Sequence, residues 1–304
     1  MGESSLWRAM DEPRGESAAV PPAGAGELLG LSPGARVLIV NSDDFGMYQA
    51  VNGAVVRSIE QGIASSCSLM VPCPGARHAM ALLRQKPDIP FGIHLTLVCE
   101  MTRHRWGPVS AKERVTSLLD EAGELFTPAQ IPQLLSQARL GQVELEFRAQ
   151  INAVADHGLR PTHLDWHCLA DGGRDDIFDL TVTLAREYGL AVRAWLEPGC
   201  RKLRRRGLPV VDHPFLDSFS LDLDGKTMRY AELLHRLPPG LSEWAVHPGL
   251  GTEEARTIDQ DGWRVRQTDC EFLTSPQARD LLQQEDIVII DYRPLQHAWS
   301  QAFK

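Results

Sequence analysis

The sequence places carboxylate and imidazole side chains at or near the ends of four short apolar segments. They are Asp43, Asp44, His94, His163, Asp165, His167 and His247. In parallel α/β folds the carboxyl ends of the strands lie at one edge of the sheet, where the loops that follow them converge. We therefore expect these side chains, which are far apart in the sequence, to meet at one site.

Two adjacent aspartates and several histidines can together build a metal-dependent hydrolase. One carboxylate and two neutral imidazoles form an open site for a divalent ion, with positions left for water and substrate. Such an ion lowers the pKa of bound water and polarises a carbonyl oxygen. The second aspartate can accept the proton of that water as a general base, and a histidine across the site can protonate a departing amine. These residue types therefore point to hydrolysis of an amide.

Each of these residues also has an ordinary structural explanation. An Asp-Asp pair after a strand often forms a turn or caps a helix, and a single histidine such as His94 is often a hydrogen-bonded core residue. The spacing of His163 and His167 would suit a metal pair on a helix, but the preceding Pro161 favours an extended segment in which alternate residues share a face. His247 precedes Pro-Gly and could simply occupy a turn. Because these explanations would have to hold at four strand ends at once, we favour a common site.

The elements that must position these residues follow from the apolar pattern. Seven segments have the apolar character of buried strands, namely 36–41, 66–71, 90–97, 162–166, 191–195, 244–247 and 286–292. Five stretches with apolar residues at helical spacing lie between them, namely 51–59, 75–84, 143–154, 177–188 and 276–284. No hairpin signal interrupts this alternation. It predicts an α/β fold with about seven parallel strands in a single domain, although periodicity does not decide whether the sheet closes into a barrel.

We expect this domain to span residues 36–304. Residues 1–35 are rich in Gly, Ala and Pro and predict a loosely ordered leader, or one draped over the domain. The stretch 197–239 has the least legible pattern and contains a basic cluster at 201–206. This cluster could recognise a phosphate or an acidic sugar, or form a solvated surface. Trp106, Trp166, Trp195 and Trp244 could stack on sugar faces or pack in the core, and Trp166 and Trp195 lie nearest to strand ends.

Composition and charge exclude several classes of protein. The chain has 304 residues, of which 43% are hydrophobic, and its 31 Lys and Arg against 40 Asp and Glu give a net charge of −9. This acidic balance argues against binding to nucleic acid or to an anionic membrane. No apolar stretch is long enough to span a bilayer, and the first 35 residues lack the apolar middle of a signal peptide. The six cysteines show no Cys-x-x-Cys spacing, which predicts reduced thiols in a cytoplasmic protein.

Several motifs together resemble the YdjC-type carbohydrate deacetylases, the family that contains the chitooligosaccharide deacetylases. The segment VLIVNSDDFG at 37–46 resembles the opening signature of that family. Further matches follow in the order of the family, namely GIASS at 62–66, GIHLTL at 92–97, PTHLDWH at 161–167 and HPG at 247–249. The resemblance covers roughly residues 36–294 and is thin between about 197 and 240.

This resemblance implies a barrel-like (β/α) fold of the distorted TIM type, a divalent metal such as Mg²⁺ or Zn²⁺, and removal of an N-acetyl group from an amino sugar or oligosaccharide. Carried over residue by residue, it makes Asp44, His94 and His167 the metal ligands. Asp43 would be the general base for the metal-bound water that attacks the acetamide carbonyl, and His247 the candidate acid. Arg266 resembles a late Arg-x-x-acid element and is expected to orient Asp43 or to bind substrate. A homodimer is expected by the same analogy.

The sequence departs from the family after the last metal histidine. The family continues with further histidines, whereas His167 is followed here by Cys168-Leu-Ala-Asp-Gly-Gly. Cys168 could be a spare ligand or a packing residue. The departure leaves open a second function, in which a metal-dependent deacylase acts on a non-sugar N-acyl amine or specialised metabolite. A catalytically silent carbohydrate-binding protein is a third possibility, but every proposed ligand, the base and the acid are present. Phosphoryl transfer is disfavoured because no Gly-x-x-x-x-Gly-Lys loop occurs.

Overall fold

The computed structural model describes residues 24–32, 34–101, 104–214 and 216–303. They contain eight strands in one sheet: β1 (Arg36–Phe45), β2 (Ser66–Leu69), β3 (Phe91–Leu95), β4 (His163–Trp166), β5 (Ala191–Val192), β6 (Leu216–Asp217), β7 (Gly240–Val246) and β8 (Ile287–Ile289). All the strand pairings of this sheet are parallel. The predicted α/β class is confirmed, and each of the seven expected strands is present.

The strand order is β5-β4-β3-β2-β1-β7-β6, with β8 paired beside the first half of β1. Within the described part of the chain no pairing joins β5 to β6, so the sheet is a half-barrel. The barrel-like expectation is confirmed in this open form. The strand that the sequence pattern missed is β6, which lies within the stretch 197–239 where no apolar run marks a strand.

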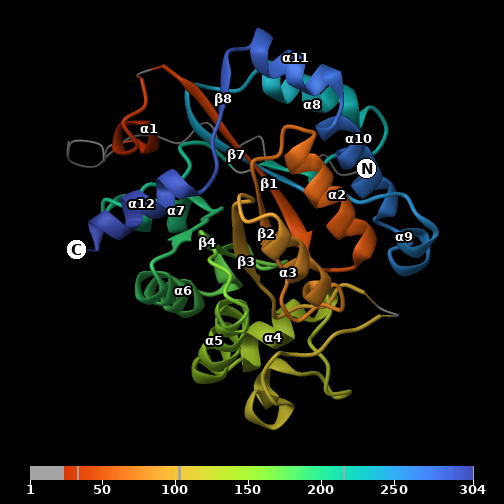
Figure 1. The fold of residues 1–304 in the computed structure, drawn as a ribbon. Helices are drawn as coiled ribbons and strands as arrows, with labels where there is room; N and C mark the ends of the chain where they lie inside the picture. The colour runs from red at the N-terminus through yellow and green to blue at the C-terminus, as the bar shows by residue number, and fades with distance from the viewer. Residues whose placement is uncertain (1–23, 33, 102–103, 215, 304) are drawn as a thin grey trace.

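Helices surround the sheet, as Figure 1 shows. They are α1 (Ala25–Leu28), α2 (Gln49–Glu60), α3 (Ala76–Gln85), α4 (Ile131–Gln137), α5 (Leu140–Asp156), α6 (Asp175–Tyr188), α7 (Glu197–Arg204), α8 (Lys226–His235), α9 (Glu253–Ile258), α10 (Trp263–Leu273), α11 (Pro276–Gln284) and α12 (Arg293–Ala302). The five predicted helical stretches correspond to α2, α3, α5, α6 and α11. None of the described helices is long and apolar enough to cross a membrane.

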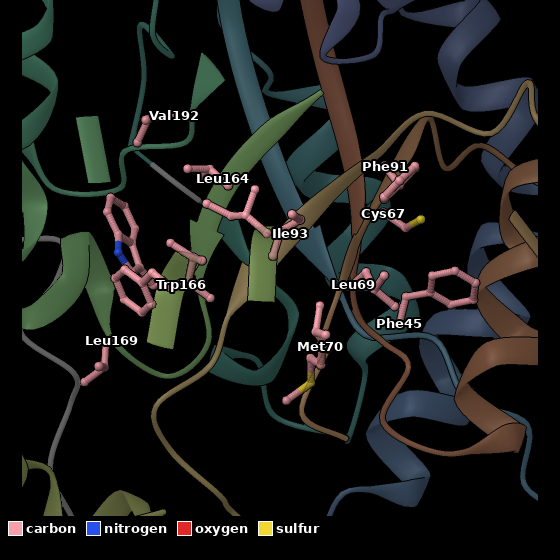
Figure 2. Close-up of a cluster of buried hydrophobic side chains, with 14 of the residues drawn as sticks. Phe45, Cys67, Leu69, Met70, Phe91, Ile93, Leu164, Trp166, Leu169 and Val192 are labelled. Carbon is pink, nitrogen blue, oxygen red and sulfur yellow. The ribbon is translucent and has the colours of Figure 1, made fainter. Parts of the chain in front are cut away.

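The core forms because every long strand contributes buried apolar side chains, as expected for a parallel sheet covered by helices. Alternate residues of some strands, such as Ser68, His163 and Asp165, are buried and polar. Figure 2 shows apolar side chains from neighbouring strands, including Phe45, Leu69, Ile93, Leu164 and Val192, packed together in one cluster. Each of these five side chains is at most 1% exposed. Their burial fixes the strands relative to one another and therefore fixes the strand ends that carry the polar residues.

The short helix α1 belongs to the segment that the sequence predicted to be loosely ordered. Ala25 is buried, its backbone N–H donates a 2.8 Å hydrogen bond to Asp212 Oδ1, and α1 contacts β7. Part of the expected leader therefore packs on the domain. Residues 1–23 of that leader lie outside the described residues.

Candidate active site

The first site residues lie at an irregular end of β1. In a regular strand, neighbouring residues such as Asp43 and Asp44 point to opposite faces. Here the register with β2 shifts between Ser42 and Phe45, and Asp44 has φ +64° in the left-handed region. Aspartate tolerates this conformation better than most residues. As a result, both carboxylates line the same pocket, which has a volume of about 630 Å³.

Asp44, His94 and His167 come together at the carboxyl ends of β1, β3 and β4. Asp44 Oδ1 lies 3.2 Å from His167 Nδ1 and 3.5 Å from His94 Nε2. One ligand atom from each residue lies within 4.8 Å of those of the other two, and all three residues are buried. Asp44 Oδ1 is buried without a hydrogen-bond partner. A buried carboxylate oxygen that has no hydrogen-bond partner and faces two imidazole nitrogens is a suitable binding position for a divalent cation.

Two further carboxylates hold the imidazole rings. His94 Nδ1 is hydrogen-bonded to Asp165 Oδ1 at 2.9 Å, and His167 Nε2 to Glu100 Oε2 at 2.7 Å. Such bonds fix the tautomer and direct the other ring nitrogen toward a metal. Burial alone would lower the pKa of His94, but Asp165, Asp44 and Asp43 raise it to about 9. A cation that binds at Nε2 would therefore displace a proton.

Asp43 is fixed by an arginine that the sequence reasoning did not identify. Arg193, the residue that follows β5, donates hydrogen bonds to both oxygens of Asp43, at 2.9 Å to Oδ1 and 2.6 Å to Oδ2. Asn41 Nδ2 also donates to Asp43 Oδ1, at 2.6 Å. Burial raises the pKa of Asp43 above its ordinary value, although Arg193 opposes that shift. The sequence did contain a signal for this contact, namely an arginine inside the apolar segment 191–195. A charged residue is rarely buried in a strand unless it is paired with an opposite charge.

Arg266 is bonded to Asp44 and Asp259, so the first of its two expected roles, orienting Asp43, is wrong. The second, binding substrate, stays a prediction. Arg266 Nη1 donates to Asp44 Oδ2 at 2.8 Å, and its Nε donates to Asp259 at 2.8 Å. Arg266 projects from α10 toward Asp44, whereas Arg193, the residue that follows β5, reaches Asp43. Burial would raise the pKa of Asp44, but the Arg266 guanidinium and the adjacent imidazoles of His167 and His94 hold it well below its ordinary value.

Asp269, the acidic residue of the Arg-x-x-acid element that begins at Arg266, is hydrogen-bonded to His247. Asp269 Oδ2 accepts a 2.8 Å hydrogen bond from the backbone N–H of His247, and Lys226 Nζ lies 2.9 Å from Asp269 Oδ1. The His247 ring is hydrogen-bonded through Nδ1 to Ser218 Oγ at 2.8 Å. Its Nε2 lies 4.0 Å from Asp43 Oδ2. The expected acid and base are therefore close together, and His247 lies near the Asp43 oxygen that Asn41 does not contact.

All six residues to which the family resemblance gave a role line one pocket, namely Asp43, Asp44, His94, His167, His247 and Arg266. His163 and Asp165, which the sequence also singled out, are buried in β4 and are not among the residues that line it. Cys168 also lines it, with Sγ 3.3 Å from His167 Nε2. Of the four tryptophans considered for sugar stacking, Trp106, Trp166 and Trp244 are almost fully buried. Trp195 is half-buried and lines the pocket.

The basic cluster at 201–206 lies on α7 and the turn that follows it. Four of its cations have acidic neighbours, because Arg201 and Arg204 lie near Glu197 while Lys202 and Arg206 lie near Asp179. Arg201, Lys202 and Arg205 line a second pocket of about 620 Å³, next to the first. The ion pairs agree with the interpretation of this cluster as a solvated surface.

The fold and site define an α/β half-barrel with a buried acid–imidazole cluster at the carboxyl ends of its strands. The model of the family described as YdjC-like protein matches residues 37–284. The chain therefore belongs to the YdjC-like protein family, which confirms the resemblance found in its motifs.

Similar proteins cover most of the chain. A carbohydrate deacetylase of Thermus thermophilus is 34% identical over 84% of this chain and 92% of its own length. A carbohydrate deacetylase of Thermoanaerobacter pseudethanolicus is 30% identical over 84% of this chain and 98% of its own. A chitooligosaccharide deacetylase of Serratia marcescens is 27% identical, over 86% of this chain and 99% of its own.

The fold is also shared with a solved structure. A crystal structure from Enterococcus faecalis V583, described as a cellobiose-phosphate cleavage protein, matches with a TM-score of 0.73 at 24% identity. The match covers 86% of this chain and 99% of that protein. At this level of identity the likeness shows the common fold alone.

Proposed function

We propose that this protein is a hydrolase that removes an N-acetyl group from an amino sugar or oligosaccharide. The observation that carries the proposal is a second buried aspartate beside the candidate metal site. Asp43 lies next to Asp44 but is bonded to Arg193, and it lies 4.0 Å from His247. The names of the similar proteins, carbohydrate deacetylase and chitooligosaccharide deacetylase, support the same reaction.

Asp44, His94 and His167 would hold the divalent ion. A bound ion would supply Lewis-acid polarisation of the acetamide carbonyl and a lower pKa for a water molecule in the site. Two imidazoles and one carboxylate are a donor set typical of Zn²⁺ and related transition metals, whereas Mg²⁺ prefers oxygen donors. We therefore favour Zn²⁺ over Mg²⁺ as the ion.

The remaining residues account for the proton transfers. Asp43 accepts a proton from the attacking water as the new C–O bond forms at the acetamide carbon. Arg193 holds both oxygens of Asp43, so the carboxylate keeps one orientation throughout. His247 donates a proton to the amine nitrogen as the C–N bond breaks. The products are acetate and the free amine.

A second candidate function keeps this chemistry and changes the substrate to a non-sugar N-acyl amine. It is favoured by Cys168 and Leu169, which stand where the family has further histidines. Because Cys168 lines the pocket, the change alters the surface that the substrate contacts.

One experiment tests the metal site and the base together. We expect the purified protein to contain about one equivalent of divalent metal and to release acetate from short N-acetylated chitooligosaccharides. The Asp43→Asn protein should keep its metal and lose activity by at least about 10²-fold, because the general base is removed. The Asp44→Asn protein should lose the metal as well. Full activity of Asp43→Asn would refute the role of the base, and unchanged metal content in Asp44→Asn would refute the metal site.

A further inference from the structure

An exposed aromatic side chain stands at the wall of the active-site pocket. Phe219 is 42% exposed, and among the large exposed apolar side chains of the described residues it is the one that lines the pocket with Asp43 and Asp44. A single exposed apolar side chain is ordinary on a protein surface, but this one lines the pocket that holds the proposed catalytic residues. Phe219 is neither a proposed metal ligand nor a participant in the proposed proton transfers.

The local structure fixes Phe219 relative to the proposed acid. Phe219 belongs to the short 3₁₀ helix Ser218–Ser220, and its backbone N–H donates to Asp217 Oδ1 at 2.8 Å. The preceding residue, Ser218, is the hydrogen-bond partner of the His247 ring. The Phe219 ring meets that imidazole edge-on, with centroids 4.7 Å apart and planes at 77°. The aromatic ring and the proposed acid are therefore held by one three-residue segment.

A second neighbour supports the ring from α10. The guanidinium carbon of Arg266 lies 5.2 Å from the centroid of Phe219. Arg266 in turn is bonded to Asp44, so the aromatic ring is connected to both parts of the site. Asp217 lines the same pocket and supplies a carboxylate that can accept hydrogen bonds from hydroxyl groups.

We infer that Phe219 is a specificity-determining residue that stacks on the ring of the acetylated sugar beside His247. This inference rests on the proposed deacetylase function and names the part of the substrate that the site recognises. A pyranose ring presents C–H groups on one face and hydroxyl groups around its edge, which suits an aromatic ring beside a carboxylate. A small acyclic N-acetyl amine has no such face and would gain little from Phe219.

The test compares two substrates across matched variants of the metal-loaded enzyme. The substrates are N,N′-diacetylchitobiose and N-acetylethanolamine, and kcat and KM are measured separately for each. The variants are Phe219→Ala, the aromatic replacement Phe219→Trp, and the control Leu223→Ala. Leu223 is exposed nearby on the chain and does not line the active-site pocket. Phe219→Ala should raise KM for diacetylchitobiose about fivefold to tenfold with little change in kcat.

The other measurements separate stacking from a structural effect. Phe219→Trp should restore most of the affinity for diacetylchitobiose, while Leu223→Ala should behave like the wild type. The kinetics of N-acetylethanolamine, whether fast or slow, should be the same in all four proteins. A change in KM below about twofold for Phe219→Ala, or an equal change with both substrates, would overturn the inference.

A binding measurement distinguishes failure of this inference from failure of the proposed function. Diacetylchitobiose is titrated calorimetrically into Asp43→Asn protein with and without Phe219→Ala. If the wild type releases no acetate from the sugar, the proposed function is wrong, and the titration still decides the role of Phe219. Binding that weakens about fivefold or more without the ring supports the inference. Equal affinities, or no binding to either protein, contradict it.

Discussion

Asp43 and Asp44 are neighbours in the chain, yet each is bonded to a different arginine. Arg193 holds Asp43, and Arg266 holds Asp44. Burial favours a raised pKa for both carboxyl groups, and the neighbouring cations oppose it to different extents. The pKa of Asp43 stays above its ordinary value, whereas that of Asp44 falls well below it. A group that binds protons more readily suits a base, and one that stays ionised suits a metal ligand. The two environments therefore agree with the division of roles that we propose.

The orientation of Asp43 by Arg193 can be tested with Arg193→Lys. Lysine keeps the positive charge but cannot make two parallel hydrogen bonds to one carboxylate. We expect metal content to be unchanged and kcat to fall about 10–100-fold, since small errors in the position of a base are costly. Arg293→Lys is the control, because Arg293 is exposed and pairs with Asp291. A kcat close to that of the wild type would show that charge alone is sufficient.

At the scale of elements, the sequence predicted the strands that carry long apolar runs. The segments 36–41 and 90–97 contain enough apolar residues to identify β1 and β3, and the polar residues near their ends indicated where a site would form. The irregular end of β1 could not be predicted, because the left-handed conformation of Asp44 depends on the register with β2. Without that shift, Asp43 and Asp44 would face opposite sides of the sheet.

Other residues in and around the site were not predicted from the sequence, for two different reasons. Glu243 was left outside the predicted strand 244–247, although β7 includes it, because a single charged residue interrupts the apolar run. The segment that carries Ser218 and Phe219 was not identified because a two-residue strand and one 3₁₀ turn have no measurable periodicity. In both cases the position of the residue is set by tertiary contacts, which the local sequence pattern does not encode.

A buried polar network joins Arg193, which follows β5, to Glu243 of β7 and to Tyr292, which lies after β8. Glu243 Oε1 lies 3.4 Å from Arg193 Nε, and Tyr292 donates a 2.5 Å hydrogen bond to Glu243 Oε2. Burial raises the pKa of Glu243 to about 7, with Asp43 and Asp165 adding to the shift while Arg193 and Tyr292 oppose it. Glu243 is therefore protonated in the folded protein over a range in which it ionises in the unfolded chain.

The sign of this linkage gives a prediction for Glu243→Gln. Because the folded pKa is the higher one, the favourable contribution of Glu243 is complete below about pH 4.5 and is lost as the pH rises through about 7. Glutamine does not titrate, so the variant should gain stability relative to the wild type by about 1–3 kcal/mol between about pH 5 and about pH 8. Urea unfolding at the two pH values measures the difference. A parallel pH dependence of the stability of the wild type and of Glu243→Gln would contradict the prediction.

At the scale of the whole molecule, negative charge is concentrated in the interior of the half-barrel. Five buried acidic residues surround the two buried arginines, namely Asp43, Asp44, Asp165, Glu243 and Asp259. The chain as a whole also carries a net charge of −9. Buried charges are tolerated where they are paired or coordinate a metal. Without a cation, protons on His94 and His167 offset part of this charge, because neighbouring groups raise the pKa of both imidazoles. A divalent cation at Asp44, His94 and His167 would take the place of those protons.

Metal removal should therefore destabilise the entire domain and not only stop turnover. An ion present at about 100 times its dissociation constant adds about 2.7 kcal/mol to the free energy of unfolding. For a domain of this size, chelation should lower the melting temperature by about 5–10 °C, and added Zn²⁺ should restore it. Asp44→Asn removes one ligand and part of the excess charge, so its melting temperature should not respond to chelator or to Zn²⁺. If the wild type melts at the same temperature with and without chelator, the buried cluster is stable as an ion-free network, and the charge argument for a resident metal is wrong.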